Sequence, residues 1–161
     1  MPHHLMRTLI SNYPLLAAAL AWVSAQVLKT LLTLIMTRKL VLERLFGPGG
    51  MPSAHSAGVC ALSVAVARVE GIQSTLFALS IVLSCVVIYD AMGVRLHAGR
   101  QAKTLNKVVD ALERDLEGDA PEDFGGFYDD GKDLKEVLGH TPLEVLGGAL
   151  LGILVATTLR L

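Results

Sequence analysis

The chain has 161 residues, of which 52% are hydrophobic, and its mean hydropathy is +0.52. This composition is too apolar for an ordinary water-soluble domain of this length, so we expect one integral membrane domain covering residues 1–161. The net charge of -1 offers no basic surface of the kind that nucleic-acid binding requires. Cys60 and Cys85 have no metal-ligand or redox spacing, which argues against a disulfide framework or a zinc site.

Four apolar segments are suited to cross or enter a bilayer as helices. They are residues 14–36, 52–69, 75–94 and 142–160. The first contains a stretch at residues 19–21 that resembles a signal-peptidase site, but the segment is too long for the core of a signal peptide. The sequence therefore predicts an all-α fold, a polytopic membrane bundle of about four embedded helices.

A long charged stretch separates the third apolar segment from the fourth. In its first part, apolar residues recur at steps of three and four; they are Ala102, Leu105, Val109, Leu112 and Leu116. This period predicts an amphipathic helix lying on the membrane surface. Residues 115–133 follow, rich in Gly, Asp and Glu but without the spacing of a calcium-binding loop, and they predict a solvated, mobile acidic loop.

Basic residues in short connections are retained on the cytoplasmic side, so their distribution predicts orientation. The opposite side carries Arg7, Arg68 and Arg160, whereas the first and third connections are much more basic. Those connections carry Arg38, Lys39, Arg44, Arg95, Arg100, Lys103, Lys107, Arg114, Lys132 and Lys135. We therefore expect both chain ends to face outward from the cytoplasm.

The strongest local motif is Gly-Gly-Met-Pro-Ser-Ala-His at residues 49–55. Two glycines lead into Pro52, which suits the first position of a helix. The start of a helix offers backbone N–H groups and the positive end of the dipole, and Ser53 and His55 add side-chain donors, so the motif predicts an anion site. A capped helix with an interfacial histidine explains the motif equally well.

A second cluster precedes the last apolar segment. On a helix, the four-residue spacing of His140 and Glu144 puts them on one face. The carboxylate would hold one imidazole nitrogen protonated and leave the other to attack an electrophile. The alternative is structural, because Thr141 and Glu144 also fit a capping box with Pro142 at the first helical position.

Two charged residues within apolar segments are further candidates, because burying a charge is costly. Asp90 closes the third segment, and either pairs with Arg95 or Arg100 or contacts a substrate directly. Lys29 lies inside the first segment, and either extends to the cytoplasmic surface or projects into a phosphate pocket. With the expected orientation, His55, Asp90 and His140 all fall at one membrane face, which favours a single site over unrelated helix caps.

Pro52-Ser53-Ala54-His55 resembles the P-S-x-H motif of the type-2 phosphatidic acid phosphatase superfamily. The last motif of that superfamily, a His followed four residues later by an acid and then a Gly, is similar to His140, Glu144 and Gly147. The blocks GGMPSAHSA, YDAMGVR, AGRQAKTLN and LKEVLGHTPLEVLGG resemble a divergent bacterial and plastid branch of the superfamily.

The resemblance implies metal-independent phosphoryl transfer. His140 would attack phosphorus, Glu144 would orient it, and His55 would protonate the leaving oxygen. Lys29 resembles the lysine of the first superfamily motif, Arg38 or Arg44 would replace the arginine after it, and Lys135 lies nearest to the arginine that precedes the nucleophile. With Ser53, Asp90, Arg95 and Arg100, these residues are the expected phosphate-binding set.

The sequence thus predicts a lipid-phosphate phosphatase with no cofactor. The protein is expected in the inner membrane, with its active site facing the cytoplasm. Phosphatidylglycerophosphate, phosphatidic acid and isoprenyl phosphates are the candidate substrates. The rivals are a non-catalytic protein that binds a lipid head group and a metal-dependent phosphotransferase built around Asp90. Gly148 and Gly152 permit close helix packing within the chain or between protomers, so a homodimer is one expected arrangement.

Overall fold

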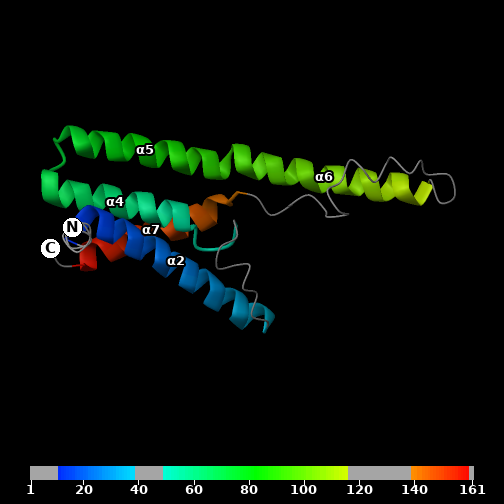
Figure 1. Cartoon of the computed structure of the whole chain (residues 1–161), viewed down its shortest axis with the longest axis horizontal. Coiled ribbons are helices and arrows are strands. Elements are labelled where there is room, and N and C mark those ends of the chain that lie inside the picture. Colours follow the sequence, from blue (N-terminus) through cyan, green and yellow to red (C-terminus); the bar gives the residue numbers. More distant parts are fainter. Residues whose placement is uncertain (1–10, 39–48, 116–138, 160–161) are drawn as a thin grey trace, which may run out of the picture.

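The computed structural model describes residues 11–38, 49–115 and 139–159, which form α-helices and their short connections. Within these ranges there are five helices and no strand (Figure 1). They are α2 (Tyr13–Thr37), α4 (Ala54–Glu70), α5 (Thr75–Met92), α6 (Val94–Asp115) and α7 (Pro142–Thr158). The expected all-α class is therefore confirmed.

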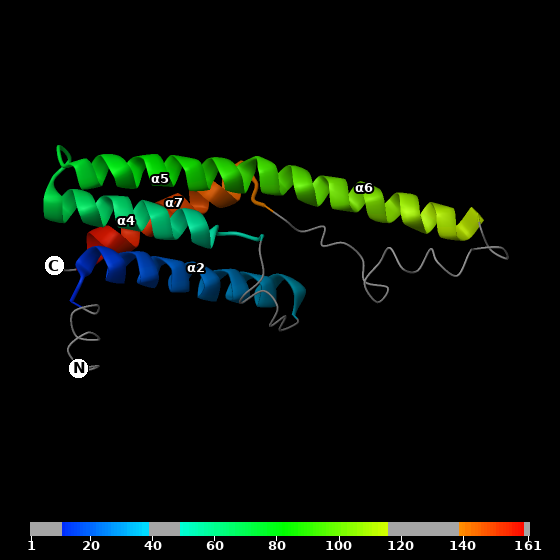
Figure 2. The ribbon, with the colours of Figure 1, turned by 45° about the horizontal axis from the view of Figure 1, so that its top comes forward.

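Helix α4 is the centre of the bundle, because it packs against α2, α5 and α7. The start of α2 and the ends of α4 and α7 meet at one end of the bundle (Figure 2). There the Arg68 guanidinium donates to the Tyr13 hydroxyl and to the carbonyl oxygens of Ala156 and Leu159, the last at 2.9 Å. Because the helices alternate in direction, the starts of α4 and α7 and the end of α5 share the opposite end.

The boundaries agree with the expected apolar segments, with one local difference. Pro52 does not begin α4; it lies before Ser53, whose side chain accepts a hydrogen bond from the backbone N–H of Ser56 and so caps the helix. The peptide bond between Met51 and Pro52 is cis. The proline therefore shapes the turn that leads into the helix and is not its first residue.

The amphipathic segment forms a helix, as expected. Helix α6 begins at Val94, directly after Gly93, and continues beyond the starts of α4 and α7 roughly along the line of α5 (Figures 1 and 2). The expected acidic loop, residues 115–133, lies outside the described residues apart from Asp115, the last residue of α6.

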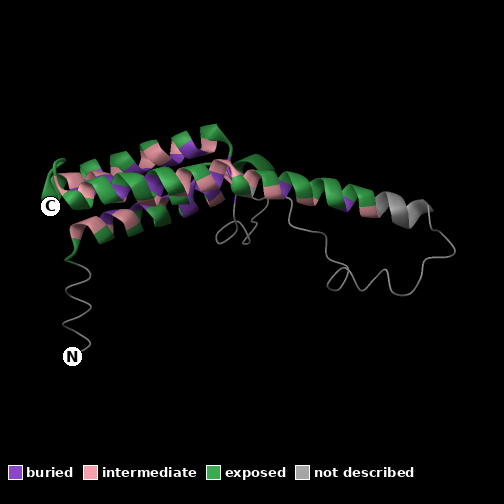
Figure 3. Ribbon diagram, turned by 90° about the horizontal axis from the view of Figure 1, so that it is seen from above, coloured by how far each residue is buried: buried purple, intermediate pink, exposed green. Residues whose placement is uncertain are grey.

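The interior of the bundle is made of small residues, and the large apolar side chains lie on its outside (Figure 3). The core cluster is Ala17, Ala21, Ala25, Ala54, Ala57, Ala61, Ala65 and Ala156. By contrast, Leu79 and Val82 of α5 are each 61% exposed. A water-soluble bundle buries such residues, whereas helices in lipid pack through small residues and direct large apolar ones outward. Residues 13–37 and 75–109 are also long and apolar enough to cross a membrane.

Two glycines of α7 permit its close approach to α4. A Cβ atom on Gly148 would lie 2.2 Å from the Ser53 carbonyl oxygen, and one on Gly152 would lie 2.2 Å from that of Ala57. Between α4 and α5 the contact is polar instead, since the hydroxyls of Ser63 and Ser84 lie 2.9 Å apart. The Gly148–Gly152 face is thus used within the chain and is not available for pairing two protomers.

Candidate active site

The start of α7 holds His140 and Glu144 in direct contact. Thr141 is the N-cap and Pro142 the first helical residue, as the capping-box pattern predicted. Glu144 Oε2 accepts a hydrogen bond from the Thr141 backbone N–H at 3.1 Å and lies 3.1 Å from His140 Nδ1. Glu144 therefore caps the helix and is also positioned for the other role that the sequence left open, contact with the imidazole. His140 lies before the helix, so the cap brings the two side chains together, and a shared helix face does not.

This contact sets the chemistry of the His140 ring. An ionised carboxylate can only accept a hydrogen bond, so this contact favours the neutral tautomer of the ring that has its proton on Nδ1 and its lone pair on Nε2. The side chain is only 5% exposed. Its backbone is fixed as well, because the His140 N–H donates to the Ala91 carbonyl oxygen of α5 at 2.9 Å. An oriented, mostly buried imidazole with a defined lone pair is the arrangement that a nucleophile requires.

His55 lies in the first turn of α4 and faces His140. The ring centroids are 6.1 Å apart and the ring planes meet at 62°, so the rings are not stacked. The Ser53 backbone N–H donates to the Glu144 carbonyl oxygen at 2.9 Å, which joins the start of α4 to the first turn of α7. Two imidazoles on adjacent helix starts are thus held in a fixed relation.

A cavity of about 250 Å³ joins these residues to α5. Its walls are formed by His55, Val86, Val87, Asp90, Ala91, Gly139 and His140. The structure therefore brings His55, Asp90 and His140 to one place, as the expected convergence required. Sequence reasoning missed the two valines, since an apolar residue in an apolar segment carries no distinguishing signal; only the four-residue step from Val86 to Asp90 places both on one face of α5.

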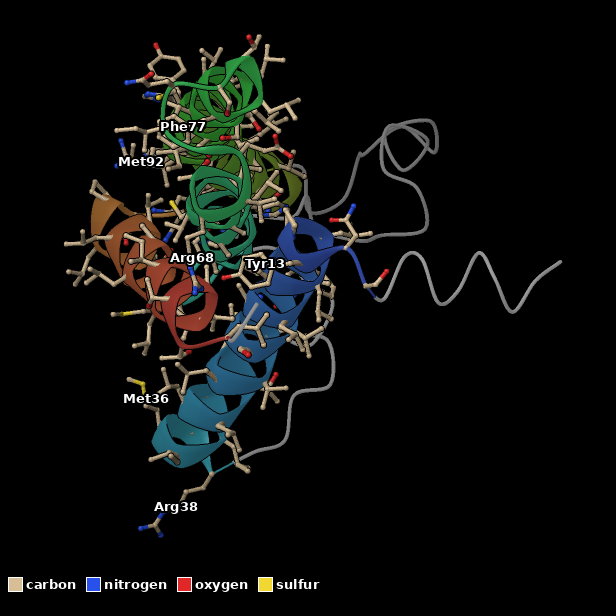
Figure 4. The ribbon with its side chains drawn as sticks, turned by 90° about the vertical axis from the view of Figure 1, so that its left-hand side faces the viewer. Tyr13, Met36, Arg38, Arg68, Phe77 and Met92 are labelled. Carbon is tan, nitrogen blue, oxygen red and sulfur yellow. The ribbon has the colours of Figure 1, made fainter. Side chains whose placement is uncertain are left out.

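The other expected phosphate-binding residues lie elsewhere or outside the described part. Ser53 is fully buried, caps α4 and is not part of the cavity wall. Lys29 is 3% exposed, and its side chain packs on Gly50, where an added Cβ would lie 3.0 Å from its Cδ. Arg38 is exposed at the far end of α2 and points away from the other helices (Figure 4). Arg100 is exposed on α6.

Lys135 and the side chain of Arg95 fall outside the described residues. Among the residues that are described, the cavity wall contains neither arginine nor lysine. The cavity lies close to the starts of α4 and α7, because His55 is in the first turn of α4 and Gly139 and His140 directly precede the N-cap of α7. In the described ranges, no three His, Cys, Asp or Glu side chains are grouped to hold a metal ion.

Comparison with known proteins identifies the family. The model of the Divergent PAP2 family, in which PAP2 denotes type-2 phosphatidic acid phosphatase, matches residues 10–155. The chain belongs to this family. The match covers every helix but the final residues of α7, so the Divergent PAP2 assignment applies to the whole bundle, and the resemblance drawn from the sequence motifs is confirmed.

A curated relative of this Divergent PAP2 protein is "Uncharacterized membrane protein YuiD" of Bacillus subtilis (strain 168). The two sequences are 43% identical over 153 residues, which are 94% of this chain and 96% of the relative. No solved structure matches the chain. The name of the relative and the outward-facing apolar residues agree that this is a membrane protein.

Proposed function

We propose that this protein is a lipid-phosphate phosphatase that hydrolyses a phosphate monoester through a phosphohistidine on His140. The observation that carries the proposal is the 3.1 Å contact of His140 Nδ1 with Glu144 Oε2, beside a cavity that His55 also lines. This contact supports the proposal because an ionised carboxylate beside Nδ1 favours the neutral tautomer of the ring whose lone pair is on Nε2.

The reaction proceeds in two steps. His140 Nε2 attacks phosphorus, the ester P–O bond breaks, and His55 in its protonated form gives its proton to the leaving alkoxide oxygen. Water then attacks the phosphohistidine, His55 takes a proton from it, and the P–N bond breaks to release phosphate. The N-termini of α4 and α7 are proposed to stabilise the charge on the equatorial oxygens, with Lys135 and Arg95 as the proposed additional cations.

A lipid substrate is supported by the outer edge of the cavity. Val86 belongs to the cavity wall and is also 61% exposed on the outer surface of α5. Val86 thus gives the cavity wall an exposed apolar part, and we propose that a lipid enters the cavity past it from the bilayer. We propose a multi-pass protein of the inner membrane whose cavity faces the cytoplasm, with phosphatidylglycerophosphate, phosphatidic acid or an isoprenyl phosphate as substrate.

The test is phosphate release from these three lipids by purified protein in detergent, with chelator present. Wild type should release phosphate, His140→Ala should reduce the rate to background, and His55→Ala should slow it by about 10²- to 10⁴-fold. His97→Ala is the matched control, because His97 is exposed on α6 and does not line the cavity. Equal rates for wild type and His140→Ala would end the proposal.

A second function is favoured by one observation, the lack of arginine and lysine among the described residues of the cavity wall. A protein that binds a lipid head group without cleaving it fits this feature. It predicts binding of a lipid phosphate with no release of phosphate by wild type. A phosphotransferase that needs a metal at Asp90 predicts instead that chelator abolishes activity.

A further inference from the structure

The cavity has two chemically different sides. His55, Gly139 and His140 form one side, close to the starts of α4 and α7. Helix α5 forms the other side, and its contribution is Asp90, Ala91, Val86 and Val87. The Asp90 carboxylate repels a phosphate dianion, whereas His55, in the protonated form that the proposed reaction requires, attracts it. The phosphate of a bound substrate is therefore expected beside the histidines and away from Asp90.

The position of Asp90 relative to the nucleophile is fixed by the backbone. Ala91, its neighbour, accepts the hydrogen bond of the His140 N–H at 2.9 Å. With the phosphate beside the histidines, the alkyl group that leaves from it is expected on the α5 side of the cavity, which Asp90, Val86 and Val87 line. Val86 lies four residues before Asp90, which is about one helical turn, or roughly 6 Å, along α5.

We infer that Asp90 selects the leaving group, by accepting a hydrogen bond from a hydroxyl on the carbon next to the phosphorylated carbon. This rests on the proposed phosphatase function. A carboxylate offers about four acceptor sites, so a bond within the protein leaves capacity for a substrate. An ester or a plain hydrocarbon at this position offers no donor, so it gains no hydrogen bond from Asp90.

The inference distinguishes the three candidate lipids. Phosphatidylglycerophosphate has a free hydroxyl on the carbon next to the phosphorylated one, whereas phosphatidic acid has an ester there and an isoprenyl phosphate has only carbon. The substrate class that fits the α5 side is a lipid whose terminal phosphate is carried on a polyol head group. Beyond the hydroxyl, Val86 and Val87 contact the apolar part of the lipid.

The experiment uses two lipids that differ by one hydroxyl, phosphatidylglycerophosphate and its analogue with propanediol in place of the head-group glycerol. For wild type, kcat/KM should be about 10- to 100-fold higher for the hydroxyl-bearing lipid, the effect expected of a hydrogen bond to a charged group. Asp90→Ala should bring the ratio close to one by slowing only that lipid. Asp90→Asn keeps the shape of the side chain and should give an intermediate ratio.

A matched control is Glu70→Gln, because Glu70 is an exposed acid at the opposite end of α4 and should leave the ratio unchanged. A wild-type ratio near one would overturn the inference, and so would an unchanged ratio in both Asp90 variants. An equal loss on both lipids would overturn it as well, since Asp90 would then act through His55 or the fold. If wild type cleaves neither these two lipids nor phosphatidic acid nor an isoprenyl phosphate, the phosphatase proposal itself fails. If it cleaves both lipids without regard to Asp90, or cleaves only phosphatidic acid or an isoprenyl phosphate, only the inference fails.

Discussion

Gly148 lies so close to the carbonyl oxygen of Ser53 that a Cβ atom on this residue would come within 2.2 Å of it. Ser53 caps α4 two residues before His55, and Gly148 lies one turn after Glu144, so this contact joins the two halves of the candidate site. The approach of α7 to α4 therefore determines both stability and the distance between the histidines.

Gly148→Ala should force α7 away from α4. Overpacking of this kind costs about 1–3 kcal/mol, more than the roughly 1 kcal/mol that alanine gains in helix propensity. We expect a lower melting temperature in detergent and a loss of phosphatase activity. Gly147→Ala is the control, since its Cβ would meet the flexible end of Met51 at 3.1 Å and should be tolerated. Equal melting temperatures for wild type and Gly148→Ala would contradict this packing.

The two roles of Glu144 are separable by mutation. Glu144→Gln keeps an oxygen that accepts from the Thr141 N–H and from His140 Nδ1–H, but removes the negative charge that would stabilise the positive ring formed when Nε2 attacks, so stability should be kept and kcat should fall by about 10²-fold or more. Thr141→Ala removes the hydroxyl that accepts from the Glu144 N–H and should cost about 1 kcal/mol while kcat is largely kept. Thermal unfolding and kinetics on both variants test this prediction. A Glu144→Gln variant with the kcat of wild type would show that Glu144 acts only as part of the helix cap.

The outward direction of large apolar side chains predicts how charge affects insertion. Val82 is 61% exposed near the middle of α5, so Val82→Asp should reduce recovery in the membrane fraction, because an aspartate near the centre of a membrane helix costs about 2.5–3.5 kcal/mol. Ile72→Asp is the control, since Ile72 is 72% exposed in the connection between α4 and α5. If both variants reach the membrane equally well, the outer face of α5 does not contact hydrocarbon.

The sequence was sufficient to predict the helices and to predict at which end of the bundle the candidate site lies. Hydropathy and helix caps are local properties, so the apolar segments and the capping box at Thr141 could be predicted with close boundaries. Successive helices of the bundle run in opposite directions. The starts of α4 and α7 and the end of α5 therefore lie at the same end, which brings His55, Asp90 and His140 together.

The tertiary structure alone decided which face of each helix is internal and which side chains reach the cavity. In a membrane protein both the core and the surroundings are apolar, so hydropathy does not distinguish the lipid-facing side from the packed one. Hydropathy therefore did not predict that Ser53 is buried as a helix cap, that Val86 lines the cavity, or that Gly148 packs against α4 within the chain. The two contacts of Glu144 could not be predicted from the sequence, because a helix cap and a histidine partner both place an acid at this position. Only the location of one carboxylate oxygen, Oε2, shows that it makes both contacts.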